Sequence, residues 1–462
     1  CRDHRGRILM SLVVIDPLFG ARTTASSDRS QLNSVLGQPI ADIGMAPRLL
    51  AQMAVNEIRG QADGLPPEPE IFGVAARLFA TGTLDGESPE RYAQLVMLSA
   101  GLTIAGVRRA ILDIVTQLNE LPKTTAAELP RTEFGEGFRT RWVPRGKIFT
   151  GVMASNHPAP NGSWLQALFH GYSVLVRPGN RDPFTPRRLI AALITAGLPP
   201  HKVAFLPCPH AVGEYLLGEA DRGIVYGGER AVARWRGQES VAVRGPGKAK
   251  ALLDIDLDDA VLDHLAFSAS FDGGARCTNL SAVFTTRPIA EVADGLALRL
   301  SKLPVLSAVD PAATLLMVDR GRARQLQGQL SAMRSELIDH SGDLDAHDVF
   351  VELDDGSFVL RPVVLSARRS DHPLVGTELP FPFVVVAPWS EDDGIVPLRD
   401  SLVLNLLTDR EELVDRAVRE PSIRKVAKGT VLPWATVPGI PHDDNFTQFL
   451  LEPKGVIYDS RE

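Results

Sequence analysis

Between residues 147 and 243, short apolar runs alternate with amphipathic runs, and this alternation constrains the fold more than any other feature of the sequence. Residues 147–154 and 172–176 have the length and composition of buried strands, and residues 186–196 have apolar side chains at helical spacing. Strands that alternate with helices at this pitch form a parallel, doubly wound sheet. A second alternating unit begins after residue 244, so we predict an α/β fold with two doubly wound parallel-sheet domains.

The same pattern predicts the domain boundaries. We assign residues 1–243, together with about 400–430, to a first domain and residues 244–399 to a second. In residues 133–148, aromatic residues alternate with Gly and Arg, which predicts a hairpin. With residues 431–462 as a C-terminal arm, this hairpin is expected either to pair subunits or to form a solvated surface ribbon.

Composition excludes several classes of function. The 462 residues carry 49 basic and 56 acidic side chains, a net charge of −7, so there is no basic excess to neutralise nucleic-acid phosphates. No run reaches the roughly 18 apolar residues that a membrane span requires. The three cysteines provide neither a disulfide framework nor the paired spacing of metal ligands. We therefore expect a cytoplasmic protein that binds no metal, no nucleic acid and no membrane.

The candidate nucleophile is Cys277, in the stretch Phe271-Asp-Gly-Gly-Ala-Arg-Cys-Thr-Asn279. Its thiol follows a Gly-Gly turn and precedes the apolar run 280–284, so a rigid element is expected to hold it at its end. The thiolate is the reactive form of cysteine, and backbone N–H groups at such a turn can stabilise an oxyanion. On this stretch alone, a buried and unreactive cysteine is the alternative.

Three loops that follow predicted strands of the first domain contain Gly, Asn or Pro, at residues 155–158, 177–180 and 227–229. Ligands bind parallel sheets at the carboxyl ends of the strands, and such loops allow the backbone to approach a phosphate. None of the helices that follow opens with a Gly-x-Gly-x-x-Gly fingerprint, so that test does not indicate a dinucleotide.

From about Arg139 to Leu432, the order and spacing of the motifs resemble those of the aldehyde dehydrogenase superfamily. The resemblance implies that the first domain binds NAD(P) and that the second carries the catalytic thiol of Cys277. Ser155-Asn-His-Pro158 stands where the family has a Trp-Asn-Phe-Pro type of loop. This implies that the side chain of Asn156 and the backbone N–H of Cys277 stabilise the oxyanion. A helix N-cap is the alternative role for Asn156.

Other motifs similar to those of the family imply contacts with the cofactor. Arg177-Pro-Gly-Asn180 stands in place of Lys-Pro-x-Glu, and without the carboxylate a 2′-phosphate is not repelled, so we expect a slight preference for NADP over NAD. Thr377-Glu-Leu-Pro-Phe-Pro382 resembles Glu-x-Phe-Gly-Pro, although its loop sequence departs at two positions. The cofactor-binding residues that the resemblance implies are Ser155, Arg177, Gly179, Asn180, Gly227, Gly228 and Glu378.

Arg244-Gly-Pro-Gly-Lys248 departs from the family's Glu-Leu-Gly-Gly-Lys, in which the Glu activates the water that hydrolyses the acyl-enzyme. Arg244 cannot replace this base, because arginine does not release its proton in proteins. Superfamily members that lack the Glu include those that reduce or form acyl thioesters. The resemblance therefore implies that Cys277 accepts an acyl group from CoA or a carrier protein, and that NAD(P)H reduces it to an aldehyde, or the reverse.

Two other functions stay open. One is oxidation of an aldehyde to a carboxylic acid, with a substitute base such as His157, His264 or Asp272. The other is a catalytically silent member with a binding or structural role. In either enzymatic case the substrate is a small aldehyde or acyl thioester, and the family commonly forms homodimers or homotetramers through its hairpin and C-terminal strand.

Overall fold

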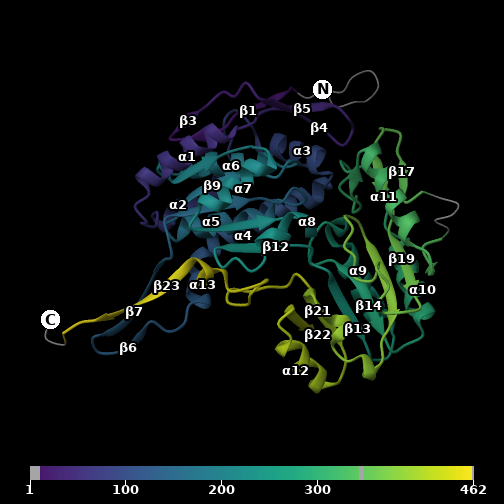
Figure 1. Ribbon diagram of the computed structural model, residues 1–462. Helices are drawn as coiled ribbons and strands as arrows, with labels where there is room; N and C mark the ends of the chain where they lie inside the picture. Colours follow the sequence, from purple (N-terminus) through teal and green to yellow (C-terminus); the bar gives the residue numbers. More distant parts are fainter. Residues whose placement is uncertain (1–10, 343–347, 460–462) are drawn as a thin grey trace.

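The computed structural model describes residues 11–342 and 348–459, so the ends of the predicted domains, including Cys1, lie outside the described residues (Figure 1). Two seven-stranded sheets dominate the structure. Their strand orders are β12-β11-β8-β9-β10-β2-β3 and β16-β19-β20-β14-β13-β21-β22. Most neighbouring strands in both sheets run parallel, and helices cover both faces, so the predicted α/β fold with two doubly wound sheets is confirmed.

Five parallel strands form the centre of the first sheet, and a short antiparallel hairpin extends one edge. Their carboxyl ends therefore meet at one edge of the sheet. The strands are β8 (Ile148–Val152), β9 (Ser173–Arg177), β10 (Val203–Phe205), β11 (Arg222–Tyr226), β12 (Val241–Arg244), β2 (Leu18–Phe19) and β3 (Arg22–Thr23). A separate sheet consists of β1 (Val13–Ile15), β5 (Pro39–Gly44) and β4 (Arg29–Asn33).

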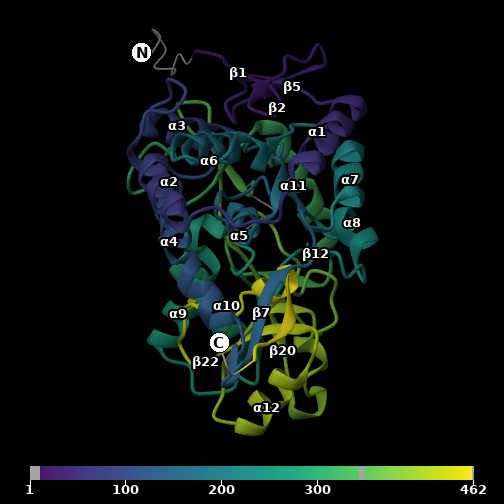
Figure 2. The ribbon, with the colours of Figure 1, turned by 90° about the vertical axis from the view of Figure 1, so that its left-hand side faces the viewer.

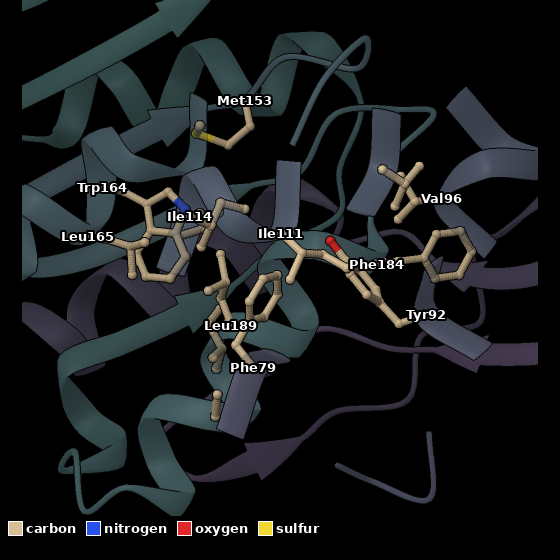
Figure 3. Close-up of a cluster of buried hydrophobic side chains, with 14 of the residues drawn as sticks. Phe79, Tyr92, Val96, Ile111, Ile114, Met153, Trp164, Leu165, Phe184 and Leu189 are labelled. Atoms are coloured by element: carbon tan, nitrogen blue, oxygen red, sulfur yellow. The ribbon is translucent and has the colours of Figure 1, made fainter. Parts of the chain in front are cut away.

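Helices cover both faces of the first sheet. The helices α1 (Arg48–Gln61) and α7 (His210–Glu219) pack on one face, where Ile148 and Leu175 point. The opposite face, with Phe149 and Val174, is covered by α2 (Pro69–Thr81), α3 (Pro89–Ala100), α4 (Ile104–Glu128), α5 (Gly162–Phe169) and α6 (Phe184–Thr195). Buried aromatic and aliphatic side chains fill the space between these helices and the sheet (Figure 3).

Local signals explain where several of these helices begin and end. The Ser88 hydroxyl accepts a hydrogen bond from the Arg91 N–H at the start of α3, and Gly101, with φ of 78°, ends it. Among the described residues no single helix has the length and apolar composition of a membrane span; α3 and α4 reach them only as a pair bent by 116°. The apolar residues of this pair lie in the core of the first domain.

The second sheet has six parallel strands and one antiparallel edge strand. In sheet order they are β16 (Leu337–Asp339), β19 (Val363–Ala367), β20 (Phe383–Pro388), β14 (Leu280–Thr285), β13 (Ala249–Leu253), β21 (Ser401–Leu407) and β22 (Ile423–Lys428). The helices α9 (Asp259–Ser270) and α10 (Ile289–Leu300) pack on one face; α11 (Arg320–Met333) and α12 (Glu411–Arg419) pack on the other. A small sheet of β15 (Met317–Val318), β18 (Phe358–Leu360) and β17 (Phe350–Glu352) accompanies them.

One part of the predicted domain assignment is wrong. Residues 400–430 were assigned to the first domain, but β21 pairs with β13 and β22 pairs with β21, so both strands belong to the second sheet. Ser401–Leu407 is an apolar strand whose residues are almost all buried. It takes the position beside β13 in the second sheet.

A three-stranded ribbon projects from the body of the molecule (Figures 1 and 2). It consists of β6 (Glu133–Gly135), β7 (Phe138–Pro144) and β23 (Leu451–Ile457), and β23 pairs with β7 along its whole length. The short helix α13 (Phe446–Leu450) leads into β23. Chain segments about 310 residues apart thus form one element, because the predicted hairpin and the predicted C-terminal arm pair with each other.

Candidate active site

A continuous cleft of about 2000 Å³ runs along the carboxyl ends of the first-sheet strands and reaches the loop that carries Cys277. Its lining comes from the ends of β8, β9, β11 and β12, from residues 275–278, and from the segment before α13. Because ligands of doubly wound sheets bind at the carboxyl ends of the strands, this cleft is the candidate active site. The described residues contain no group of three or more side chains suited to hold a metal ion.

Two glycines fix the loop that carries the thiol. A Cβ atom at Gly247 would lie 1.8 Å from the carbonyl oxygen of Cys277, so only glycine allows this close approach. Gly274 has a φ of +80°, and a Cβ there would lie 2.5 Å from the carbonyl carbon of Phe381. The Arg244–Lys248 segment, the thiol loop and the loop that contains Glu378 are therefore in backbone contact with one another.

The carboxylate of Asp272 fixes the thiol loop through ion pairs with arginine side chains. Its buried carboxylate pairs with Arg276 at 2.6 Å and with Arg109 at 3.2 Å, and His157 Nε2 lies 3.6 Å from it. Burial alone would raise the pKa of Asp272, but the nearby His157 and the charge of Arg276 outweigh it and lower the pKa. Asp272 is thus a paired structural anion. It does not line the cleft, so it is no substitute base.

Cys277 is half-buried in the cleft wall, just before β14. Burial, together with the negative charges of Glu378 and Asp443, raises the pKa of its thiol to about 12. The thiol therefore keeps its proton near neutral pH. Its Sγ atom lies 3.7 Å from Nε2 of His442, which comes from the segment before α13.

Asn156 lies beside the thiol loop, at the end of β8. Its side-chain Nδ2 donates a hydrogen bond of 2.8 Å to the carbonyl oxygen of Ala275, two residues before Cys277. An amide nitrogen carries two hydrogens, so one of them stays available to an oxygen bound near the sulfur. The fold thus brings together the two residues that the sequence nominated for catalysis, although their roles stay predictions.

Most of the predicted cofactor residues line the first-domain end of the cleft. They are Ser155, Arg177, Asn180, Gly227 and Gly228, whereas Glu378 lines the cleft from the second domain, beside Gly247. Gly179 does not line it: a Cβ atom there would lie 2.1 Å from the carbonyl oxygen of Ala154, so this glycine allows two loops to pack closely. Nothing lies within 4 Å of the Cβ position of Gly228, so this part of the cleft is open.

Arg177 is buried, and its guanidinium is already engaged. Nη2 donates to Oδ1 of Asn180 at 2.6 Å, and Nε donates to the carbonyl oxygen of Cys208 at 3.2 Å. Its charge lowers the pKa of the nearby His210, which also lines the cleft. Burial raises the pKa of the Cys208 thiol to about 11, and Cys208 lies in the core, so it is no candidate nucleophile.

Glu378 contacts the loop that carries the family's base in related sequences. Its Oε2 accepts hydrogen bonds from the backbone N–H groups of Gly247, at 2.5 Å, and Lys248, at 3.4 Å. Burial raises the pKa of Glu378, although these hydrogen bonds oppose the change. One oxygen of the carboxylate, Oε2, is therefore held by backbone N–H groups, and the charge of Glu378 acts on the thiol of Cys277.

Arg244 lies in the cleft wall at the end of β12, and two acidic residues neutralise it. Its two terminal nitrogens contact the Asp444 carboxylate at 2.7 and 3.3 Å, and Nη1 lies 3.3 Å from Asp443. Arg424 of β22 contacts Asp443 from the other side, at 3.4 Å. The side chains of Arg244 and Asp443 are only 15% and 14% exposed, so water screens this pair little.

Sequence reasoning missed the segment His442-Asp443-Asp444. Two features of the sequence could have indicated this segment. One is the polar run His-Asp-Asp-Asn directly before an apolar segment, and the other is an arginine at a buried position, which needs a carboxylate partner. Of the two histidines predicted as substitute bases, His157 lines the cleft, whereas His264 is buried on α9 and bonded to Asn405 at 2.7 Å. It does not line the cleft.

Comparisons with known proteins agree with this architecture. A sequence model described as the aldehyde dehydrogenase family matches residues 73–427. No curated protein sequence matches the chain. Among solved structures, the indole-3-acetaldehyde dehydrogenase AldA from P. syringae, in complex with NAD+ and IAA, superposes with a TM-score of 0.80 at 17% identity, with 96% of each chain covered.

Two further structures are similar to the chain. The 1-pyrroline-5-carboxylate dehydrogenase from Thermus thermophilus has a TM-score of 0.79 at 15% identity, over 96% of this chain and 92% of that one. Proline utilization A from Bdellovibrio bacteriovorus has a TM-score of 0.80 at 16% identity. The match covers 96% of this chain but only 50% of proline utilization A, so the chain spans about half the length of that protein.

Proposed function

The chain belongs to the aldehyde dehydrogenase family, and from this premise we propose that it is an NAD(P)-dependent oxidoreductase that acts on acyl thioesters. In the proposed reaction an acyl group carried by CoA or by a carrier protein is transferred to Cys277 and reduced to an aldehyde, or the reverse. Family membership supports the coarser statement, an aldehyde dehydrogenase-type oxidoreductase. The residues around the thiol favour the thioester.

The arrangement around Arg244 is the observation that carries the proposal. Formation of a carboxylic acid needs a base that activates water at the acyl-enzyme. The position of that base is occupied by Arg244, paired with Asp443 and Asp444. Glu378, the other carboxylate whose charge reaches the thiol, is bonded to backbone N–H groups. Transfer to a thiol avoids the need to activate water, because a thiol is the better nucleophile.

The acyl transfer would use groups that lie together in the cleft. The sulfur of Cys277 forms a bond to the carbonyl carbon of the thioester, and negative charge develops on the carbonyl oxygen. The Asn156 amide and the Cys277 N–H are the proposed donors to that oxygen, and one such donor typically lowers the barrier by about 3 kcal/mol. The bond to the leaving thiol then breaks. A bound nicotinamide dinucleotide would supply the hydride that releases the aldehyde.

The first-domain end of the cleft fits a dinucleotide. Gly228 borders open space just after β11, at the carboxyl end of the sheet where phosphates approach, and Gly227 lines the same cleft. At the predicted adenosine end, Arg177 and Asn180 are bonded to each other, and the position of the family's acidic residue holds an uncharged amide. We propose a slight preference for NADP, because Asn180 replaces the carboxylate that would repel a 2′-phosphate at this position.

A second candidate function is oxidation of an aldehyde to a carboxylic acid. The observation that favours it is the imidazole of His442, 3.7 Å from the sulfur, since a neutral imidazole can activate water. His264 and Asp272 do not line the cleft. His157 does, but its ring is buried with Nε2 3.6 Å from Asp272, so His442, which lies beside the sulfur, replaces the bases named from the sequence in this alternative.

A comparison of substrates separates these functions. We expect acyl thioesters with apolar or aromatic acyl groups to consume NADPH and yield aldehyde, with a higher kcat/KM than the same aldehydes oxidised without added thiol. Each reaction should be run with both NADPH and NADH. Acid formation from the aldehyde, without thiol and at the higher kcat/KM, would favour the second function. If the protein shows no turnover, binds no dinucleotide and is not alkylated at Cys277, it is a catalytically silent member.

A further inference from the structure

We propose that His442 is the catalytic acid–base of this site, and that Arg244, at the position of the family's base, holds His442 beside the thiol. The inference rests on the proposed function, because it takes Cys277 as the nucleophile. It assigns the proton of Cys277 to a residue 165 positions further along the chain. It also gives a structural role to the Arg at position 244, where the family has Glu.

The contact between the two side chains has the geometry of proton transfer. His442 Nε2 lies 3.7 Å from Cys277 Sγ, within the longer range that sulfur allows, and both residues line the cleft. A neutral imidazole that carries its proton on Nδ1 can accept one through Nε2. Contacts between nucleophile and base are commonly loose without substrate and shorten in the complex.

Desolvation and nearby charges set the protonation state of each partner before substrate binds. The thiol of Cys277 is protonated near neutral pH, because burial and the charges of Glu378 and Asp443 raise its pKa. Desolvation in the cleft lowers the pKa of His442 to about 4, although part of the residue is exposed. Positive charges that act on the imidazole in the same direction belong to Lys425 of β22, Arg244 of β12 and Arg276 of the thiol loop, while Asp444 opposes them. A protonated thiol therefore faces an uncharged acceptor.

The position of the imidazole is set by the two residues that follow it. Arg244 contacts Asp444 through both terminal nitrogens, and this bidentate arrangement is the strongest geometry for an arginine–carboxylate pair. Asp443 is gripped between Arg244 and Arg424, at 3.3 and 3.4 Å. Arg244 touches neither the sulfur nor His442 through these bonds, so it acts as a positioning residue.

The proton moves without any additional reactant. As the sulfur bonds to the carbonyl carbon of an acyl thioester, the Cys277 S–H bond breaks and His442 Nε2 takes the proton. When the tetrahedral adduct collapses, the bond from carbon to the leaving sulfur breaks and its electron pair stays on that sulfur. His442 then returns the proton to the leaving thiolate. The products are an acyl-Cys277 thioester and a free thiol, and His442 is neutral again.

The rate at which iodoacetamide alkylates Cys277, measured between pH 6 and pH 10, tests the inference. In the wild type we expect a rate that changes little between pH 7 and pH 9, because His442 takes the proton. In His442→Gln we expect a rate at pH 7 at least tenfold lower, which then rises about tenfold per pH unit as the thiol ionises without help. Peptide mass mapping identifies Cys277 as the alkylated residue.

Variants of Arg244 test the positioning role. Arg244→Met should reproduce part of the loss at pH 7, and Arg244→Lys should restore part of the rate, since Lys keeps one charged contact. In a thioester assay, His442→Gln should lower kcat by about 10² with little change in KM, as expected for lost acid–base assistance. The matched control is His201→Ala, because His201 precedes β10 at the end of the sheet opposite the cleft.

The outcomes separate this inference from the proposed function. If Cys277 in His442→Gln is alkylated at the wild-type rate at every pH, the inference is overturned and the proposed function stands. A wild-type Cys277 that neither reacts with iodoacetamide nor accepts an acyl group overturns both. If His442→Gln does not fold, as judged by circular dichroism, His442→Asn takes its place, and the expected loss is the same.

Discussion

At the scale of single residues, the cleft contains an unusual distribution of charge. A cation, Arg244, stands where a carboxylate would activate water, and one of its two acidic partners, Asp443, raises the pKa of Cys277. The thiol therefore depends on a neighbouring base. This arrangement suits acyl exchange between thiols, in which one proton leaves Cys277 and returns to the departing sulfur.

The first prediction concerns the restoration of the family's base. Arg244→Glu would place a third carboxylate against Asp443 and Asp444, and breaking a largely buried ion pair in this way costs about 3 kcal/mol. We therefore expect a lower melting temperature and a loss of thioester turnover, with no gain in acid formation. The triple variant Arg244→Glu/Asp443→Asn/Asp444→Asn should recover stability. A single variant as stable as the wild type that forms acid would contradict this account.

The sequence predicts the thiol and the amide beside it as site residues, but it does not predict the imidazole. Cys277 and Asn156 belong to local motifs with recognisable neighbours, whereas His442 is defined only by a contact across 165 residues. Gly179 shows the opposite case: the motif nominated it as a cofactor residue, and the structure gives it a packing role against Ala154. A motif predicts where in the chain a loop lies, but it does not predict the conformation of the loop backbone.

At the scale of elements, the catalytic loops are locked together by backbone contacts. The segment before β13 lies against the carbonyl oxygen of Cys277 at Gly247, and the loop before β20 lies against Gly274. Strand pairing was harder to predict than strand existence, because the partner of a strand is decided by surfaces far away in sequence. The strands β21 and β22 therefore joined the second sheet against expectation.

A glycine-to-alanine pair tests the locking of these loops. In Gly247→Ala the new methyl group would clash with the Cys277 carbonyl, so we expect a destabilisation of about 1–3 kcal/mol, the usual range for overpacking, and loss of thiol reactivity. Gly328, in the exposed middle of α11, has nothing within 4 Å of its Cβ position. Gly328→Ala should therefore stabilise the protein by about 0.5–1 kcal/mol. Thermal and denaturant unfolding measure both, and equal stability of the two variants would refute the locking.

At the scale of the whole molecule, the ribbon of β6, β7 and β23 projects from the body of the protein (Figure 1), and it carries exposed apolar side chains. Phe138 and Ile457 are paired in register and are 53% and 75% exposed. Large exposed apolar residues on a projecting sheet mark an interaction surface. This favours subunit pairing over a solvated ribbon, the two alternatives that the sequence left open.

The prediction for assembly is a homodimer or homotetramer that depends on this ribbon. Phe138→Ser/Ile457→Ser should shift the mass measured by light scattering to that of the monomer, with little change in secondary structure, because both side chains already face solvent within one chain. A double variant with Ser at Leu49 and Met53, exposed on α1, is the control. A wild-type monomer, or an unchanged mass in the ribbon variant, would show that the ribbon does not pair subunits.

The most direct test of the central claim is to trap the acyl-enzyme. The protein is incubated at pH 7.5 with N-acetylcysteamine thioesters of acetyl, hexanoyl and benzoyl groups, which mimic the reactive end shared by CoA and carrier proteins, in the absence of reduced cofactor. We predict an intact mass increased by one acyl group, mapped to Cys277, with one equivalent of thiol released and no adduct in Cys277→Ala. An unmodified wild-type mass with all three thioesters, or an adduct that persists in Cys277→Ala, would contradict the account.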